Sequence, residues 1–363
     1  MSRRSITFFQ VGNGNCTLLQ LDNVTMVFDL HKSALDWLRS CIPTRDGKRY
    51  IDVLCISHGD VDHCGGFREL KKEMEEDRLV IGEIWHPNFD RVKVEGKDGL
   101  PDDYLALREE VLRRRRVKNP GYGDIEIPLR AWDDESKVFK RITPPKDFSL
   151  RCLSPYVKDE GDTGWDVNEV SLVLRVEISS MRILFPGDSG CEIWQSRIIP
   201  LTLSKDDKAE WAEAEILVAS HHGSFTFFGT DREAVRDANP YPDNYEALDY
   251  IKPKILVVSA CSRFPTNGDS ANEHPPHYAA WKWYHRWFRE NRDVDENDKH
   301  PGCFKYTADG HLRLEYDGSD WIWKTDWAPD DDGGRGGKGQ STYETTGFIY
   351  RGGETKRAGG RYA

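Results

Sequence analysis

A dense group of potential metal ligands follows the apolar run Ile51–Ser57. His58, Asp60, Asp62 and His63 fall within six positions of one another there. Imidazole and carboxylate groups together suit divalent cations of borderline to hard character, such as zinc and manganese. The pattern predicts a metal site on a turn that follows a strand; a chance pair of histidines on a polar loop is the alternative.

Two later apolar runs end in the same way. Arg182–Pro186 runs into a glycine and then Asp188, and Ala214–Ser220 runs into His221 and His222. If these strand ends lie side by side, their loops converge on one edge of a sheet, where rigid strands hold ligands that loops contribute. We therefore expect these side chains to form one site.

His274 lies on a loop beyond a further apolar run, Lys254–Ala260. Two interpretations of this histidine stay open. Either it faces the substrate or the leaving group as a proton donor, or it is a hydrogen-bonded structural residue.

The elements that must position these residues are short strands interspersed with helices, which predicts an α/β protein with layers of sheet covered by helices. The predicted buried strands are Ile6–Gln10, Thr17–Leu21, Thr25–Asp29, Ile51–Ser57, Leu79–Trp85, Ser171–Ile178, Arg182–Pro186, Ala214–Ser220 and Lys254–Ala260. The predicted helices are Ser33–Cys41, Phe67–Arg78 and Ala279–Asn291, and the aromatic stripe of the last one indicates a packing face.

A charged stretch punctuated by proline and glycine, about residues 90–148, is interpreted as an insertion with a helix near Asp102–Lys118. Its basic run, Arg113–Arg116, is interpreted as a solvated helix face because acidic residues precede it, and a substrate-binding patch is the alternative. Residues 1–325 are predicted to form one domain. Residues 328–363 are rich in glycine and charge, which is typical of a tail that is flexible or ordered only against a protein partner.

Composition excludes several classes of protein. The chain has 363 residues with 38% hydrophobic residues and 12 tryptophans, enough for a sizeable core. No run approaches the ~20 apolar residues that cross a bilayer, so no membrane partner is expected. The eight cysteines show no paired spacing, which indicates reduced thiols and a cytoplasmic protein. A net charge of −11 argues against holding nucleic acid by bulk attraction.

The segment from His58 to His63 resembles the His-x-His-x-Asp-His motif of metallo-β-lactamase-fold hydrolases, with Asp60 where the second His usually stands. Asp188, in Phe-Pro-Gly-Asp, resembles their metal-bridging Asp. The Asp60 variant is similar to the hydrolase domain of the ComEC-type DNA-internalisation competence proteins. The other segments that resemble this subgroup are Phe9–Asn15, Val27–Asp29, Asn168–Leu174, His221–Ser224, His274–Pro275 and Tyr306–Gly310.

This resemblance spans about residues 5–317 and implies a four-layer αββα metallo-β-lactamase sandwich. Three features depart from the subgroup. Gln10 and Asn15 replace acidic residues, and the membrane channel of ComEC is absent. The isolated third-motif histidine is not apparent, and Asn168, Glu169 or Asp166 are candidates for its place.

The resemblance also implies roles for the site residues. His58 and Asp60 would hold one metal, Asp62 and His63 a second, and Asp188 would bridge them. His221 is favoured to complete the second site. His222, with Asp62 and His274, is assigned a catalytic role as a substrate contact or proton donor, and Asp29 is a candidate for orienting a ligand histidine.

The implied cofactor is one or two divalent ions, zinc or manganese, with magnesium possible because Asp60 adds a hard ligand. Such ions lower the pKa of water to near neutrality and suit in-line attack on a phosphodiester. We therefore expect a phosphodiesterase or nuclease that acts on DNA or RNA. The alternatives are a hydrolase of a small substrate (a cyclic nucleotide, ester or lactone) and a catalytically inactive interaction module.

Overall fold

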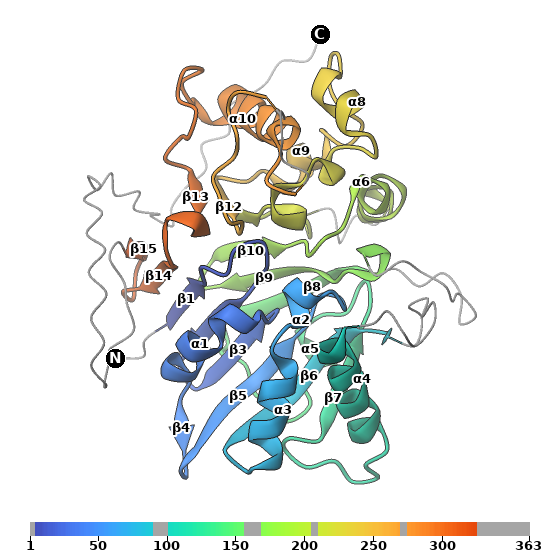
Figure 1. Ribbon diagram of the computed structural model, residues 1–363, viewed down its shortest axis with the longest axis vertical. Coiled ribbons are helices and arrows are strands. Elements are labelled where there is room, and N and C mark those ends of the chain that lie inside the picture. The colour runs from blue at the N-terminus through green and yellow to red at the C-terminus, as the bar shows by residue number, and fades with distance from the viewer. Residues whose placement is uncertain (1–3, 90–100, 156–167, 205–209, 269–273, 325–363) are drawn as a thin grey trace.

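Two β-sheets form the centre of the structure, a computed structural model that describes residues 4–89, 101–155, 168–204, 210–268 and 274–324 (Figure 1). The first sheet has nine strands in the order β15-β14-β1-β2-β3-β5-β6-β7, with β4 paired to β5. Its strands are β1 (Arg4–Phe8), β2 (Thr17–Leu21), β3 (Val24–Phe28), β4 (Thr44–Arg45), β5 (Lys48–Cys55), β6 (Leu79–Pro87), β7 (Ile125–Leu129), β14 (Leu312–Tyr316) and β15 (Trp321–Lys324).

The second sheet has six strands in the order β13-β12-β11-β10-β9-β8. They are β8 (Phe148–Ser154), β9 (Val173–Ile178), β10 (Met181–Phe185), β11 (Ile216–Val218), β12 (Ile255–Val258) and β13 (Phe304–Tyr306). The α-helices are α1 (Leu35–Cys41), α2 (Val61–Cys64), α3 (Phe67–Glu75), α4 (Asp102–Arg115), α5 (Glu135–Val138), α6 (Cys191–Ile193), α7 (Ile199–Leu203), α8 (Arg232–Asp237), α9 (Ala247–Ile251) and α10 (Tyr278–Arg292). A π-helical turn, Trp194–Ile198, joins α6 to α7, and 3-10 turns occupy Lys32–Ala34, Asn168–Val170, Ser220–Gly223, Phe225–Phe227 and Thr307–Asp309.

The outer face of the first sheet is covered by α1, α3 and α4. Alternate residues of a strand point to opposite faces of its sheet. Leu18 and Val27 accordingly pack in a cluster with residues of these helices, while their neighbours Leu19 and Met26 pack in a second cluster between the two sheets. The alternating residues of each strand therefore contribute to two apolar interfaces, one on each face of the sheet.

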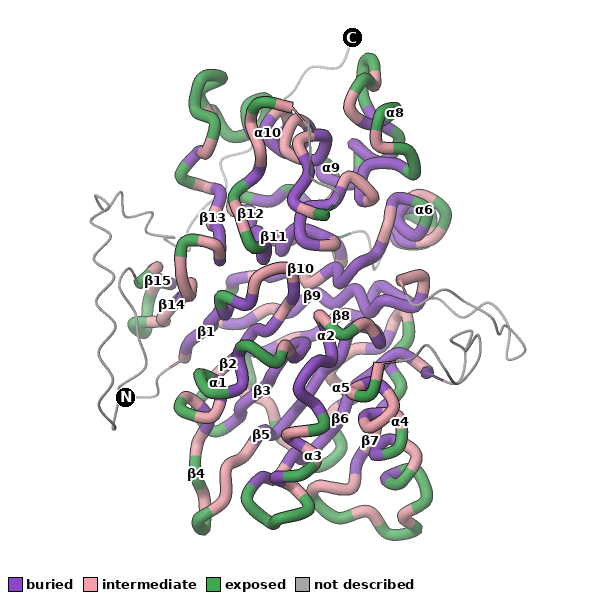
Figure 2. Tube along the Cα trace, viewed as in Figure 1, coloured by how far each residue is buried: buried purple, intermediate pink, exposed green. Residues whose placement is uncertain are grey.

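The second sheet repeats this arrangement on its own two faces. Ile216 and Val257 join the cluster between the sheets, while Leu217 and Leu256 pack against residues of α9 and α10 in a third cluster. Three apolar interfaces require four layers. Figure 2 agrees with this order, because the strands at the centre are mostly buried and the outer surfaces of the helices are exposed. The predicted four-layer αββα fold is confirmed.

Strand direction brings distant parts of the chain to one edge. β3, β5, β6 and β7 run parallel to one another in the first sheet, and β10, β11, β12 and β13 do so in the second. The carboxyl ends of parallel neighbours lie at the same edge of a sheet. The loops after β3, β5, β10 and β11 carry the predicted site residues, so the topology gathers them from both sheets.

The predicted insertion supplies α4, α5 and the edge strand β7, while its residues 90–100 lie outside the described residues, as does the predicted tail, 328–363. The interpretation of the basic run as a solvated face is wrong for Arg114. Its guanidinium is buried, and it donates to Glu110 at 2.7 Å and to the carbonyl oxygens of Ile81, Gly82 and Ile125. Arg114 thus ties α4 to β6 and β7.

All eight cysteines are free thiols. Among the helices in the described ranges, none is both long and apolar enough to cross a bilayer; α10, one of the longest, has 15 residues.

Helix α4 also fixes the loop that carries the predicted metal ligands. A Cβ at Gly59 would lie 2.5 Å from the buried ring of Tyr104, so this position admits no side chain unless α4 moves. We predict that Gly59→Ala lowers the free energy of unfolding by about 1–3 kcal/mol, the usual cost of overpacking. Urea denaturation measures this loss. Gly302→Ala is the control, since a Cβ there meets nothing within 4 Å, and equal stability of both variants would contradict the proposed contact.

Candidate metal centre

Asp29 is the buried acid on which the centre is built. It follows β3 in a left-handed conformation (φ 55°), and its carboxylate accepts hydrogen bonds from the Ser57 backbone N–H at 2.6 Å and the Ser57 hydroxyl at 2.9 Å. The same carboxylate contacts Nδ1 of His63 at 2.8 Å. Asp29 therefore positions both the end of β5 and a predicted ligand, the role expected for it.

The short helix α2 carries Asp62 and His63 out of the loop after β5. Its carbonyl oxygens are held by other segments, since Asn15 N–H donates to Asp62 O at 3.0 Å and Leu30 N–H donates to His63 O at 2.8 Å. The chain then leaves through Gly66, whose φ of 90° favours glycine. The two ligands are thus attached to the loops after β1 and β3.

His221 and His222 follow β11 in consecutive left-handed conformations, with φ values of 47° and 56°. Such conformations cost roughly 1–3 kcal/mol each in a non-glycine residue and are concentrated at functional sites. Their effect here is to turn the two rings apart, with ring planes at 77°. The two neighbouring histidines therefore face different sides of Asp188.

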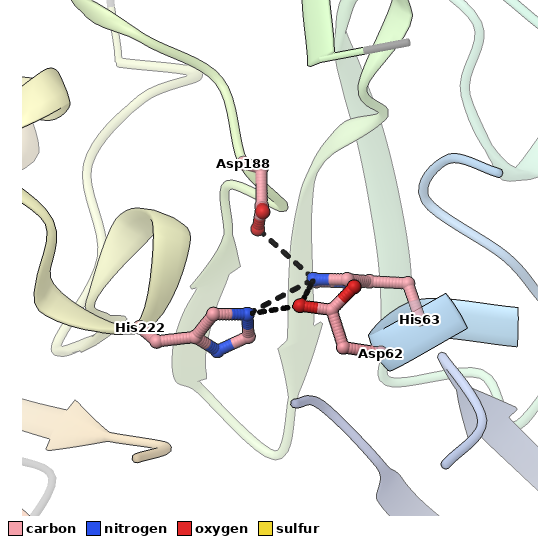
Figure 3. Close-up of side chains that lie close together, drawn as sticks. All are labelled: Asp62, His63, Asp188 and His222. Carbon is pink, nitrogen blue, oxygen red and sulfur yellow. Dashed lines mark hydrogen bonds and ion pairs between the residues drawn. The ribbon is translucent and has the colours of Figure 1, made fainter. Parts of the chain in front are cut away.

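Asp62, His63, Asp188 and His222 form a compact group (Figure 3) whose ligand atoms all lie within 4.8 Å of one another. Nε2 of His63 lies 3.0 Å from Oδ1 of Asp188 and 3.3 Å from Nε2 of His222. Nε2 of His222 lies 3.1 Å from Oδ2 of Asp62. Strands of both sheets are needed to bring these four residues together.

The outward contacts of the two histidines show which ring nitrogen carries the proton. His63 Nδ1 faces the Asp29 carboxylate, and His222 Nδ1 lies 3.0 Å from the carbonyl oxygen of Ser259. Because these partners only accept, each Nδ1 donates, and in the neutral rings each Nε2 presents a lone pair. Two lone pairs 3.3 Å apart, with two carboxylates beside them, repel one another unless a cation or proton lies among them.

A second group lies on the other side of Asp188. His58 Nε2 is 3.5 Å from Asp60 Oδ2 and 3.7 Å from Asp188 Oδ2, and His221 Nε2 is 3.5 Å from that same Asp188 oxygen. The Ser57 hydroxyl proton goes to Asp29, so His58 Nδ1 donates to Ser57 Oγ at 3.0 Å. His58 Nε2 is then a buried acceptor without a hydrogen-bond partner, which is the environment of a metal ligand.

Asp188 joins the two groups because each of its oxygens faces one of them. Its Oδ1 is also without a hydrogen-bond partner, although His63 Nε2 lies 3.0 Å away, since the geometry is not that of a hydrogen bond. The lone pairs on this oxygen and on His58 Nε2 are therefore free for cations. The donor set fits the implied divalent metal, with four imidazoles and three carboxylates available for two ions that share Asp188.

Electrostatics in the group favour positive charge. Burial raises the pKa of Asp188, but the adjacent His63 and His58 outweigh it and hold that pKa well below its usual value. Burial lowers the pKa of His63, but Asp188 and Asp29 outweigh it and raise that pKa well above the usual value. Burial also opposes ionisation of Asp62, yet His222 and His63 lower its pKa to about 2. A divalent ion would take the place of the proton on His63, so metal affinity falls as pH falls.

The predicted residues divide as follows. His58, Asp60, Asp62, His63, Asp188, His221 and His222 come together. The structure places His222, where the sequence favoured His221, beside Asp62 and His63, because the left-handed turn rotates the second ring into that group. His222 is then positioned as a ligand candidate, whereas a catalytic contact was expected.

His274 stays a candidate for the catalytic role predicted for it. It is exposed, and no hydrogen bond or ion pair joins it to the cluster within the described ranges; its neighbour Pro275 accepts a hydrogen bond from Asn13 instead. Sequence reasoning missed Ser259 and Thr226, which contact Nδ1 of His222 and His221. Their positions just after β12 and just after the His-His pair were available signals.

Comparison with known proteins agrees with the predicted resemblance. No family model matches the chain. It is 25% identical over 242 residues to ComE operon protein 3 of Bacillus subtilis, a match that covers 64% of this chain and 22% of that protein. The chain therefore spans about a fifth of the length of that curated relative.

Two solved structures of low identity also match. The metallo-β-lactamase fold protein YhfI of B. subtilis is 11% identical, with a TM-score of 0.39 over 71% of this chain and 86% of that one. Zn²⁺-bound PqqB of Methylobacterium extorquens is 11% identical, with a TM-score of 0.45 over 86% of this chain and all of that one. Because both TM-scores are low, the fold assignment rests on the sheet order and layers described above.

Metal binding should stabilise the folded chain. At a metal concentration 100 times Kd, a ligand that binds only the folded state adds about 2.7 kcal/mol. We expect Zn²⁺ or Mn²⁺ to raise the melting temperature of the chelator-treated protein, and His222→Ala and His221→Ala each to lose one ion by mass spectrometry. No thermal shift and no bound metal in the unsubstituted chain would contradict the assignment.

Removing the Asp29 charge should weaken metal binding without removing a ligand. Asparagine tolerates the left-handed backbone, but its neutral amide no longer strengthens the binding of a metal by His63. We predict a 10–100-fold loss of metal affinity for Asp29→Asn, about the effect of losing such an orienting partner, measured by competition with a chromogenic chelator. Asp46→Asn is the matched control, because Asp46 is exposed and has φ 52°. Unchanged affinity in Asp29→Asn would remove Asp29 from the centre.

Proposed function

We propose that the chain is a metal-dependent hydrolase that cleaves phosphodiester bonds, with DNA or RNA as its substrate. The observation that carries the proposal is Asp188, whose two oxygens face two separate histidine–aspartate groups. A pair of divalent ions held by these residues would supply Lewis-acid charge and would make an activated water available for in-line displacement at phosphorus. The resemblance of the motif to the ComEC-type hydrolase domain supports a nucleic-acid substrate.

The substrate's direction of approach follows from the exposure of the site residues. The side chains of His58, His63 and Asp188 are at most 2% exposed and form the floor of the centre. Asp60 is 45% exposed and His221 is 29% exposed, so the open side lies between them. A scissile phosphate would enter from this side and meet the divalent charge directly.

The buried histidines hold their orientation during such a reaction because each Nδ1 is bound outside the centre. Asp29, Ser57 and Ser259 keep the Nε2 atoms aimed inward, so no reorganisation is needed as charge develops. Burial lowers the pKa of His221, which leaves it neutral at pH 7 and suited to bind a metal rather than to donate a proton.

One observation favours the smaller substrate as a second candidate. A cleft of about 260 Å³ adjoins Asp188 and His221, and Glu169 and Glu192 line it with no lysine or arginine in its described lining. Carboxylates repel the flanking phosphates of a polymer, whereas a cyclic nucleotide, ester or lactone brings little charge besides the reacting group.

The two candidates are separated by assaying the purified chain with Mn²⁺ or Zn²⁺ on single-stranded DNA, duplex DNA, RNA and bis(p-nitrophenyl) phosphate. We expect metal-dependent cleavage, inhibited by chelator, that falls by roughly a hundredfold or more in Asp188→Asn because both ion positions lose a ligand. Asp36→Asn, whose side chain is 95% exposed, is the control and should retain activity.

A rate on polymers that falls steeply with salt supports backbone contacts, while turnover of small diesters alone supports the second candidate. Equal rates for Asp188→Asn and the unsubstituted chain would overturn both. Bound metal without hydrolysis of any substrate would identify an interaction module of the same fold.

A further inference from the structure

A cavity of about 430 Å³ lies between the edges of the two sheets, away from the metal centre. Leu314, Trp321 and Trp323 line it from β14 and β15, and Ile255 and Lys305 line it from β12 and β13. β13 ends one sheet and β15 ends the other, and at the left of Figure 1 β13 lies above β14 and β15. The cavity is therefore an opening of the apolar space between the sheets.

Its position along the strands is opposite to that of the metal centre. The metal ligands follow the carboxyl ends of β10 and β11, whereas Glu215, Lys254 and Cys303, which immediately precede β11, β12 and β13, line the cavity. The volume falls within the roughly 300–1,000 Å³ of small-molecule sites. This cavity thus has the size of a separate binding site.

Lys305 places a positive charge inside this apolar space. Its neighbours Phe304 and Tyr306 pack on the helix side of the second sheet, so strand alternation turns Lys305 toward the first sheet. Its register partner, Val257, belongs to the apolar cluster between the sheets. The Lys305 ammonium lies 5.8 Å from the centre of the Trp323 ring, and no carboxylate pairs with it among the residues that the structure describes.

Trp321 adds an unsatisfied donor to the same lining. The residue is 2% exposed, and its indole Nε1–H is buried without a hydrogen-bond partner. A buried donor left unpaired costs about 1–3 kcal/mol, and a half-buried ammonium without a counter-ion is also costly. Burial lowers the pKa of Lys305, as expected for such a position.

The other charges around the cavity are solvated or already paired. Glu215 accepts from Arg182 at 2.7 Å and pairs with Lys254 at 3.7 Å. Asp295 and Asp298 are exposed and accept backbone N–H groups of Asn297 and His300. Arg292, also in the lining, donates to the carbonyl oxygens of Lys252, Pro253 and Asn291. Lys305 is therefore a lining cation left for a ligand, whereas the Trp321 N–H is not open to the cavity.

We propose that this cavity binds an amphiphilic anion, a carboxylate with an aliphatic or aromatic body. The acid group accepts from the Lys305 ammonium, and the Trp321 side chain forms part of the cavity wall. The apolar body lies against Met181, Ile216, Ile255 and Leu314. This site is independent of the metal centre, so it stands whether or not the chain hydrolyses a phosphodiester.

Edge protection is the competing explanation for Lys305, because edge strands such as β13 often carry an inward-pointing charge that prevents pairing with other chains. That role predicts a change in aggregation on substitution and no effect on ligand binding.

The test uses laurate and its neutral counterpart dodecanol, titrated into the full chain with tryptophan fluorescence and calorimetry as readouts. We expect one saturable site that binds laurate at least tenfold more tightly than dodecanol. Lys305→Met should abolish this preference, and Lys305→Arg should retain it. Lys71→Met is the matched control, because Lys71 lies on α3 outside the cavity lining and pairs with Glu109 at 2.8 Å, and it should bind laurate as the unsubstituted chain does.

The proposal is overturned if laurate shows no saturable binding, or if laurate and dodecanol bind equally to the unsubstituted chain. It is also overturned if Lys305→Met and Lys71→Met have the same effect. Should Lys305→Met aggregate, Lys305→Gln takes its place, because glutamine removes the charge and stays polar, and it should lose the preference for laurate.

Discussion

The arrangement of the site depends on one electrostatic constraint, the close approach of His63 and His222 across the two sheets. Their Nε2 atoms lie 3.3 Å apart, and Asp62 and Asp188 lie against them. In each ring the other nitrogen, Nδ1, carries the proton and donates it to a partner outside the group. Four electron-rich groups in a buried space are stable only around positive charge. Without a metal, a proton on the strongly basic His63 supplies this positive charge. A divalent ion in the same space would supply more of it.

The surrounding structure keeps that constraint in place. Asp29 binds His63 and the end of β5 together, while the left-handed turn at His221 and His222 sends the two rings to opposite sides of Asp188. Neither feature maximises stability, since a buried carboxylate and two strained backbone positions all cost free energy. Such costs are typical where a site has been arranged for ligand binding rather than for folding.

Much of this was predictable because strand ends and ligand types are local properties. The motif from His58 to His63 and the position of Asp188 follow from apolar runs that end in ligand-type residues. Which of His221 and His222 lies beside Asp62 and His63 could not be predicted, because it depends on two φ angles that no residue type specifies. The burial of Arg114 and the inward position of Lys305 were equally hidden, since both depend on which strands become neighbours.

The register between β10 and β11 decides whether the centre exists at all. At the carboxyl ends, His221 N–H donates to Gly187 O at 3.1 Å and so sets Asp188 beside the histidine pair. At the amino ends, the Glu215 carboxylate holds both the backbone N–H and the guanidinium of Arg182, at 3.0 and 2.7 Å. A slip by one residue would move the histidines by about 3.3 Å and reverse their faces. Because Glu215 also lines the cavity between the sheet edges, the contact that fixes this register adjoins the second site, and β11, three residues long, joins the two.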